Sequence, residues 1–164
     1  MRGIRSTLVL LIIALGLGAY IYFVESERSP AGAPDPLETV FDFASDDIVS
    51  LSVTTENGNH TVINKNDNRW QLVEPFTGNV DVTKVVSLSS SLASLEIQRL
   101  VAEPEDNPDL VLFGLDTPRI TIGVETISDL NLQLLIGERT PTGSDLYATV
   151  ADSNRIFLVS GFLD

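Results

Sequence analysis

Three residues of this chain have the types that a hydrolytic triad needs. His60 is the only histidine among the 164 residues, and Ser144 and Asp145 are adjacent much later in the chain. A serine nucleophile requires a histidine base, and that base requires a carboxylate to orient it. Ser144 does not lie in the Gly-x-Ser-x-Gly elbow of such enzymes, and His60 follows a turn on an expected strand. The sequence therefore favours an ordinary exposed histidine, and we expect no catalytic residues and no enzyme.

The carboxylates of the expected loops are the other side chains with ligand chemistry. They are Asp46, Asp47, Glu103, Glu105, Asp106 and Asp109. No segment has the alternating Asp or Asn residues around a central glycine that calcium loops use. With no cysteine and one histidine in the chain, a transition-metal site lacks its usual ligands. We interpret these carboxylates as solvated loop and capping residues, and we expect no metal and no cofactor.

Residues 137–147 form the exposed segment with the most varied chemistry. Their hydroxyls, backbone N–H groups and one guanidinium suit a ligand or partner that carries a carboxylate. The segment lacks the lysine and the spacing of a phosphate-binding loop. The candidate ligand or partner contacts are Arg139, Thr140, Thr142, Ser144 and Tyr147.

The competing interpretation of this segment is structural, and the sequence favours it. Gly137 and Gly143 would only let the backbone turn between two strands, since glycine adopts conformations that other residues avoid. Gly114 and Pro118 mark a second turn earlier in the chain. We therefore predict structural turns at these four residues.

Runs of β-branched and alternating apolar residues predict strands on both sides of a central helix. The Asn57-Gly58 pair is typical of a tight hairpin turn between the first two strands. The expected strands cover residues 48–55, 60–65, 69–74, 97–101, 119–125, 130–136, 146–150 and 155–159. The first three form a meander, and the last four form two hairpins.

One main helix and one short helix are expected among these strands. Asp81 is a suitable N-cap for a helix whose apolar residues recur at spacings of three and four over residues 82–95. A short helix is expected over residues 107–113, with Asn107 as N-cap and Gly114 just past its end. Together with the strands, these helices predict an α+β domain with a mostly antiparallel sheet.

The N-terminal residues predict a membrane anchor. Arg2 and Arg5 precede an uncharged run over residues 6–24, and Glu25 follows it. As a helix, this run would be roughly 28 Å long, close to the hydrocarbon thickness of a bilayer. A cleaved signal peptide is the alternative, but the run is longer than is usual for one and has no Ala-x-Ala site. We expect a retained, single-pass transmembrane helix in contact with membrane lipid.

The chain is therefore expected to have three regions. Residues 1–24 are a cytoplasmic tip and anchor, residues 25–36 are a proline-rich linker, and residues 37–164 are an extracytoplasmic domain. Arg2 and Arg5 precede the anchor, so the positive-inside rule predicts a cytoplasmic N-terminus and an anchor in the cell membrane. All 23 acidic residues follow residue 24, and the formal charge of the chain is −13. Such a surface repels phosphates, which argues against nucleic acid as a partner.

Five segments of the chain resemble one bacterial family. They are residues 22–25 (YFVE), 70–75 (WQLVEP), 114–119 (GLDTPR), 135–137 (LIG) and 140–148 (TPTGSDLYA). The family that they resemble is a membrane-anchored domain of unknown function, and many members lie beside gliding-motility-type ABC transporter auxiliary proteins. The resemblance covers nearly the whole chain. It implies an envelope protein with no established reaction and transfers no catalytic residues.

The expected function is that of a non-catalytic, membrane-anchored extracytoplasmic domain. It would be an accessory or interaction protein of a membrane complex such as an ABC-type transporter, and the transporter comes from the resemblance alone. The alternative is a binding module for a cell-wall glycan or a peptide ligand. A concave patch with exposed aromatic side chains near Tyr147 would favour the binding module, whereas a flat apolar patch would favour a protein partner.

Overall fold

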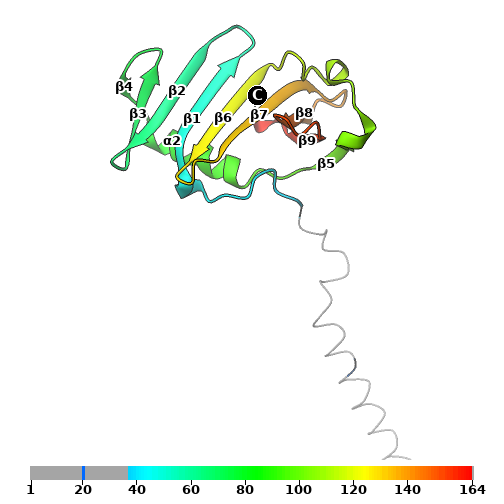
Figure 1. The fold of residues 1–164 in the computed structure, drawn as a ribbon, viewed down its shortest axis with the longest axis horizontal. Helices are drawn as coiled ribbons and strands as arrows, with labels where there is room; N and C mark the ends of the chain where they lie inside the picture. Colours follow the sequence, from blue (N-terminus) through cyan, green and yellow to red (C-terminus); the bar gives the residue numbers. More distant parts are fainter. Residues whose placement is uncertain (1–19, 21–36, 164) are drawn as a thin grey trace, which may run out of the picture. The chain divides into compact units, whose positions relative to one another are not determined.

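One antiparallel sheet organises the part of the chain that the computed structural model describes, namely Tyr20 and residues 37–163. Over these residues the sheet has nine strands in the order β4-β3-β2-β1-β6-β7-β8-β9-β5 (Figure 1). The strands are β1 Ile48–Thr55, β2 His60–Asn66, β3 Arg69–Glu74, β4 Gly78–Asn79, β5 Arg99–Ala102, β6 Ile120–Thr126, β7 Asn131–Arg139, β8 Asp145–Val150 and β9 Ile156–Ser160. The helical elements are one α-helix, α2 Val82–Ala93, and the 3-10 turns η1 Ser45–Asp47, η2 Pro104–Asp106, η3 Leu110–Phe113 and η4 Gly161–Leu163.

The pairing of β1 with β6 joins two meanders into this one sheet. β1 pairs antiparallel with β2 on one side and with β6 on the other. Leu51 of β1 is buried and stands opposite Ile63 of β2 and Val124 of β6, so apolar residues form a row across the strands. Because successive side chains of a strand point to opposite faces, the alternation that predicted the strands gives the sheet one apolar face.

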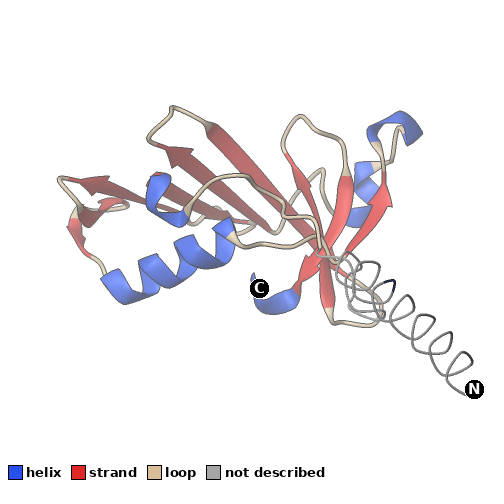
Figure 2. Cartoon of the chain, turned by 90° about the horizontal axis from the view of Figure 1, so that it is seen from below, coloured by secondary structure: helices blue, strands red, loops and turns tan. Residues whose placement is uncertain are grey.

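The chain crosses this apolar face between the two edges of the sheet. β4 and β5 are the edge strands, and α2 lies between them in the sequence. Figure 2 shows α2 running along one face of the strands. A helix of 12 residues is about 18 Å long, whereas nine strands are about 38 Å across. The helix can therefore cover only about half of the sheet.

Hydrogen bonds to the Asp81 side chain determine where α2 begins. The Asp81 carboxylate accepts hydrogen bonds from the backbone N–H groups of Thr83 and Lys84, which have no partner within the helix. The buried residues of the helix, Val85, Ser89 and Leu92, follow at spacings of four and three and so share one face. Packing of this face on the sheet holds the helix, because its serine-rich sequence has only moderate helix propensity.

An N-terminal strap, residues 37–44, pairs with the residues that lead from α2 to β5. The Val40 N–H donates to the Leu95 carbonyl at 2.7 Å, and the Ile97 N–H donates to the Glu38 carbonyl at 2.7 Å. Phe41 of the strap is buried in the same core as Leu92. The strap therefore adds apolar cover where the helix has ended.

A forked ion pair fixes the strap to the turn between β8 and β9. Arg155 donates from Nη1 and Nη2 to the two carboxylate oxygens of Glu38, at 2.7 and 2.9 Å. Its Nε lies 3.4 Å from a carboxylate oxygen of Glu103. The hydrogen-bonded Arg155 guanidinium lowers the pKa of the Glu38 carboxyl, and Glu38 in turn raises the pKa of Arg155.

The fold class predicted from the sequence is wrong. It combined an N-terminal transmembrane helix with an α+β domain that has one main and one short helix, whereas the observed domain is mostly antiparallel sheet with α2 as its one α-helix. Across Tyr20 and residues 37–163, no helix is both long enough and apolar enough to cross a membrane. The residues of the predicted anchor and linker lie outside the described residues, apart from Tyr20.

The predicted short helix fails for a local reason. Asn107 has a φ of 45° and is the left-handed cap that ends η2, whereas a helix N-cap usually has an extended conformation. Asp109 is the capping residue instead, accepting from the Val111 N–H at 3.1 Å. Only the four residues of η3 follow before Gly114, which has a φ of 66°.

Burial of Leu92 predicts a large loss of stability on truncation. Leu92→Ala should lower the free energy of unfolding by about 2–5 kcal/mol, because it leaves a cavity between α2 and the sheet. Val86→Ala on the same helix is the matched control, since Val86 is 50% exposed, and it should change stability by less than about 0.5 kcal/mol. Denaturant unfolding of the full chain measures both. Equal effects would contradict the packing of this helix face.

The ion pair between Glu38 and Arg155 predicts a pH dependence. Because the folded pKa of Glu38 lies below its unfolded value, the pair contributes stability above the ordinary glutamate pKa. That contribution is lost as the pH falls through the lowered pKa of the folded state. The difference in unfolding midpoint between the natural chain and Arg155→Gln should therefore be present at neutral pH and shrink in acid. A difference that grows in acid would contradict the pairing.

Candidate functional site

Residues 140–144 form a tight connection between β7 and β8. The Gly143 N–H donates to the Thr140 carbonyl at 2.8 Å, and the Thr140 N–H donates to the Asp145 carbonyl at 2.9 Å. Gly143 has a φ of 76°, a conformation that favours glycine. Arg139 donates from Nη1 to the Gly143 carbonyl at 3.0 Å, so this guanidinium is engaged with the turn itself.

The hydroxyls of the same connection bond to one another. Thr140 and Thr142 have their hydroxyl oxygens 3.1 Å apart, and those of Thr142 and Ser144 are 3.4 Å apart. Ser144 in turn donates to a carboxylate oxygen of Asp145 at 3.0 Å. This chain of hydroxyls supports the structural interpretation of the turn.

An open cleft of about 470 Å³ nevertheless lies beside this turn, and we call it the Tyr147 cleft. It is lined by Gln98, Arg99, Thr140, Pro141, Thr142, Asp145, Tyr147 and Leu158. Of the five predicted contact residues, Thr140, Thr142 and Tyr147 line the cleft, whereas Arg139 and Ser144 do not. The structure thus brings three of them together with residues of β5 and β9.

Arg99 is the side chain of the cleft with the strongest binding chemistry. It is exposed on the edge strand β5, opposite Leu158 of β9. Among the residues that the structure describes, no hydrogen bond or ion pair joins its guanidinium to another side chain. An unpaired guanidinium presents a planar fork of donors that matches a carboxylate or a phosphate.

The other polar groups of the cleft complement this fork. Asp145 supplies a carboxylate, Gln98 an amide and Thr142 a hydroxyl, so donors and acceptors are both present. Tyr147 is partly buried, and its ring meets that of Phe113 edge to face with centroids 5.0 Å apart. This set can bind a polar ligand, but it holds no base placed against a nucleophile.

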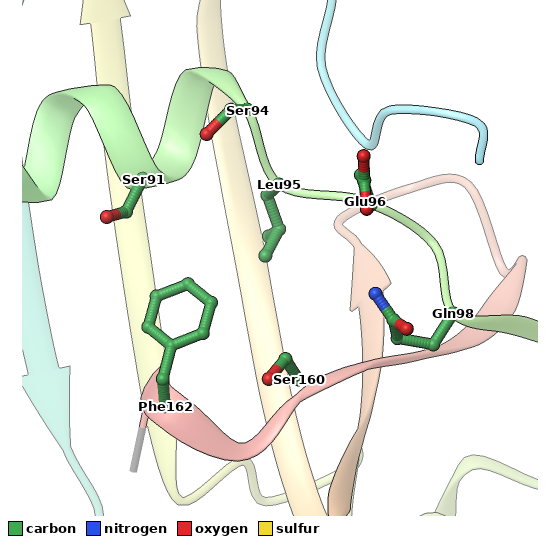
Figure 3. A pocket seen from close by; sticks show the side chains of 7 residues that line it. All are labelled: Ser91, Ser94, Leu95, Glu96, Gln98, Ser160 and Phe162. Carbon is green, nitrogen blue, oxygen red and sulfur yellow. The ribbon is translucent and has the colours of Figure 1, made fainter. Parts of the chain in front are cut away.

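A second cleft, of about 270 Å³, lies between the C-terminal end of α2 and η4. Figure 3 shows Ser91 and Ser94 of the helix on one side and Phe162 and Ser160 on the other. Gln98 lines both this cleft and the Tyr147 cleft. The polar side chains that line the second cleft are three hydroxyls, one amide and one carboxylate, beside the apolar Leu95 and Phe162, and no cation is among these lining residues.

The triad considered from the sequence is not assembled. His60 lies on β2, where its Nδ1 and the Thr54 hydroxyl are 2.8 Å apart and its Nε2 is 3.6 Å from Glu74. Three strands separate β2 from β8, which places His60 about 19 Å from the turn that carries Ser144 and Asp145.

Three of the six loop carboxylates named in the sequence cap turns. Asp47, Asp106 and Asp109 each accept a hydrogen bond from a nearby backbone N–H, those of Ala44, Glu103 and Val111 respectively. Within Tyr20 and residues 37–163, no group of three or more His, Cys, Asp or Glu residues is arranged to hold a metal ion.

Two of the predicted turn glycines, Gly114 and Gly137, allow the close backbone packing that supports the cleft. A Cβ at Gly137 would collide with the carbonyl oxygen of Phe113, and one at Gly114 would lie 2.8 Å from Cγ of Glu138. The backbone after η3 therefore packs directly on β7, which sets the Phe113 ring beside Tyr147. Pro118 lies in the connection from this turn to β6.

Sequence analysis missed Gln98 and Arg99 as site residues. Both fall in the expected strand 97–101; Arg99 lies in the observed strand β5, whereas Gln98 lies just before it. Their approach to Tyr147 depends on β5 pairing with β9, which is more than 50 residues later. The available signal was weak: an arginine in a strongly acidic chain, on a strand with no assigned neighbour.

Comparison with known proteins identifies a family. A family model described as domain of unknown function (DUF4340) matches residues 70–164, more than half of the chain, and this range contains every residue of the Tyr147 cleft. No curated protein and no solved structure matches the chain.

The close approach behind the cleft predicts different costs for three glycine substitutions. Gly137→Ala should cost about 3 kcal/mol, the upper end of over-packing, because backbone atoms obstruct the new methyl group. Gly143→Ala and Gly58→Ala should each cost only about 1 kcal/mol, since both glycines have a φ of 76° and open space around them. Unfolding midpoints of the three variants provide the comparison. A Gly137→Ala cost no larger than that of Gly58→Ala would contradict the approach of η3 to β7.

Proposed function

Since the chain belongs to the DUF4340 family, a domain of unknown function, we propose from its geometry that it is a non-catalytic interaction domain. It works on the extracytoplasmic side of a cell membrane as an accessory or interaction protein of a membrane complex, such as an ABC-type transporter. Its partner is a protein of that complex, and nucleic acid is not a partner.

The Tyr147 cleft is the observation that carries this proposal. It is open, polar and placed at the edge of a sheet, and it contains an arginine with no partner among the described side chains. Because this guanidinium is exposed and no described carboxylate engages it, its donors are accessible to a carboxylate of a ligand or partner. The cleft offers recognition groups and no catalytic pair, which favours binding over a reaction.

The location at a membrane is supported by the N-terminal sequence. The run of residues 6–24 is uncharged, and Arg2 and Arg5 precede it, so contact of this segment with lipid would hold the domain outside the cytoplasm. The acidic residues all follow this run, and anionic headgroups would repel them over a Debye length of about 8–10 Å. The domain would then be free to face a protein partner. The association with an ABC-type transporter rests on the family resemblance.

A binding module for a cell-wall glycan or a peptide is the second candidate, and the concave form of the Tyr147 cleft favours it. Glycan sites usually offer an exposed aromatic face, but the Tyr147 ring is partly buried against Phe113. Unpaired donors beside a sheet edge suit a peptide better. Both candidate functions therefore lead to the same kind of ligand, an extended peptide segment.

Photo-crosslinking in the native cells tests the proposed function. A photoreactive residue is placed in the full chain at exposed positions on different elements, such as Thr142, Lys84 and Leu112. We expect one membrane-associated protein to be captured from a contiguous subset of positions, in the membrane fraction. Capture from no position, or recovery of the chain free of membranes, would contradict the proposal.

A further inference from the structure

We propose that the open edge of β5 binds an extended segment of the partner as a tenth strand, with a carboxylate of that segment held by Arg99 in the Tyr147 cleft. This inference rests on the proposed function and specifies the binding surface and the chemistry of the bound segment.

The backbone of β5 is paired on one side only. β5 ends the sheet order, and β9 is its one neighbouring strand among the described residues. Besides the pairing with β9, no hydrogen bond within residues 37–163 uses a backbone group of Arg99–Ala102. Unpaired N–H and C=O groups along a strand edge are a template for another extended chain.

Among the described residues, the strap of the chain itself pairs with the residues just before this edge. The Gln98 N–H points to β9 and donates to the Leu158 carbonyl, whereas the Ile97 N–H donates to Glu38 of the strap. The strap therefore lies on the side of this segment away from β9. A partner strand on β5 would continue the line that the strap begins.

The sequence before the strap is poorly suited to pair with β5 as a strand. Glu38 and Val40 are the strap residues whose backbone groups bond to the segment before β5, so the next residues on that side, counting back in steps of two, are Pro36 and Pro34. Proline has no N–H to donate and is excluded from paired positions of a sheet. Prolines at these two positions would donate no backbone hydrogen bond to β5.

Charge identifies one feature of the bound segment. Arg99 projects from the same edge strand into the Tyr147 cleft and lacks a carboxylate partner among the described residues. Asp145, in the same cleft, already accepts from the Ser144 hydroxyl and presents its remaining lone pairs to donors. A segment with one carboxylate at Arg99 and amide donors beside Asp145 satisfies both. The carboxylate is either an Asp or Glu side chain or a C-terminus.

Leu100 is a suitable position for detecting contact between β5 and a partner. It follows Arg99 on β5, stands opposite Phe157 of β9 and is 39% exposed. A photoreactive residue at Leu100 therefore lies within reach of a strand added to β5. Leu112 on η3, 75% exposed, and Phe76 after β3, 67% exposed, report on other surfaces.

The test has two steps on the full chain. Crosslinking from Leu100, Leu112 and Phe76 in native membranes comes first, and mass spectrometry identifies the captured segment. A synthetic peptide of that sequence, with its C-terminus either free or amidated and with each acidic residue replaced in turn, is then titrated against the purified chain. The arms distinguish a terminal carboxylate from a side-chain carboxylate.

We expect capture from Leu100 and not from Leu112 or Phe76, and about tenfold weaker peptide binding by Arg99→Ala. Arg69→Ala is the matched control, because Arg69 is an exposed strand arginine at the far side of the sheet, and it should bind as the natural chain does. Unchanged unfolding midpoints show that both variants are folded. Arg99→Lys should recover part of the loss, since it restores the charge without the fork.

Other outcomes overturn this inference in distinguishable ways. Capture of one partner from Leu112 or Phe76 alone would place the contact elsewhere and leave the proposed function standing. If Leu100 captures the partner but Arg99→Ala binds the peptide as tightly as the natural chain does, Arg99 does not hold a carboxylate of the segment. That result would overturn the inference. Capture from no position would overturn the proposed function as well.

Discussion

The structure depends on one constraint: the chain leaves the sheet at one edge and re-enters it at the other. β4 ends the first meander at one side of the sheet, and β5 is the strand at the opposite side. The residues between them have to cross the apolar face, and they do so as α2, with Leu92 fully buried beneath it. Packing of α2 on the apolar face, driven by the hydrophobic effect, thus covers the core and also brings the chain to the edge where β5 lies. The candidate site exists because of this crossing.

Two sets of contacts then hold the delivered strand in place. The strap pairs with residues 95–97 just before β5, and Arg155 ties its Glu38 to the β8–β9 turn through two hydrogen bonds of 2.7 and 2.9 Å. From the other side, Gly114 and Gly137 let the backbone after η3 approach β7 closely, which seats Phe113 against Tyr147. The cleft between these supports is fixed by main-chain packing, and the exposed Arg99 guanidinium in it is accessible to a ligand.

Local structure was predictable from the sequence where local chemistry decides it. The predicted strand 48–55 and the Asn57-Gly58 turn match β1 and the positive φ of Gly58, and Asp81 caps α2 as expected. The short helix was not predictable from caps alone, because Asn107 takes a left-handed conformation that the pattern of residues does not reveal. The predicted transmembrane helix finds no counterpart among the described residues.

Strand order was beyond the sequence, because pairing between distant strands leaves no local pattern. Nothing near Arg99 indicates that Leu158 will be its neighbour, and so nothing indicated that Arg99 would face Tyr147. The hydroxyls of residues 137–147 bond to one another. Arg99, whose guanidinium has no side-chain partner among the described residues, comes from a strand in another part of the chain. Predicting the site required the topology first.

Residue-resolved amide hydrogen exchange over β5 tests the central claim, an open edge that a partner segment covers, most directly. In the free chain, the β5 amides that face away from β9 should exchange fast, while the Gln98 amide, bonded to the Leu158 carbonyl at 2.9 Å, should exchange slowly. With the partner segment bound, the fast amides should become slow and Gln98 should stay as it was. Amides of β5 that are all slow in the free chain, or that the bound segment leaves unchanged, would contradict the account.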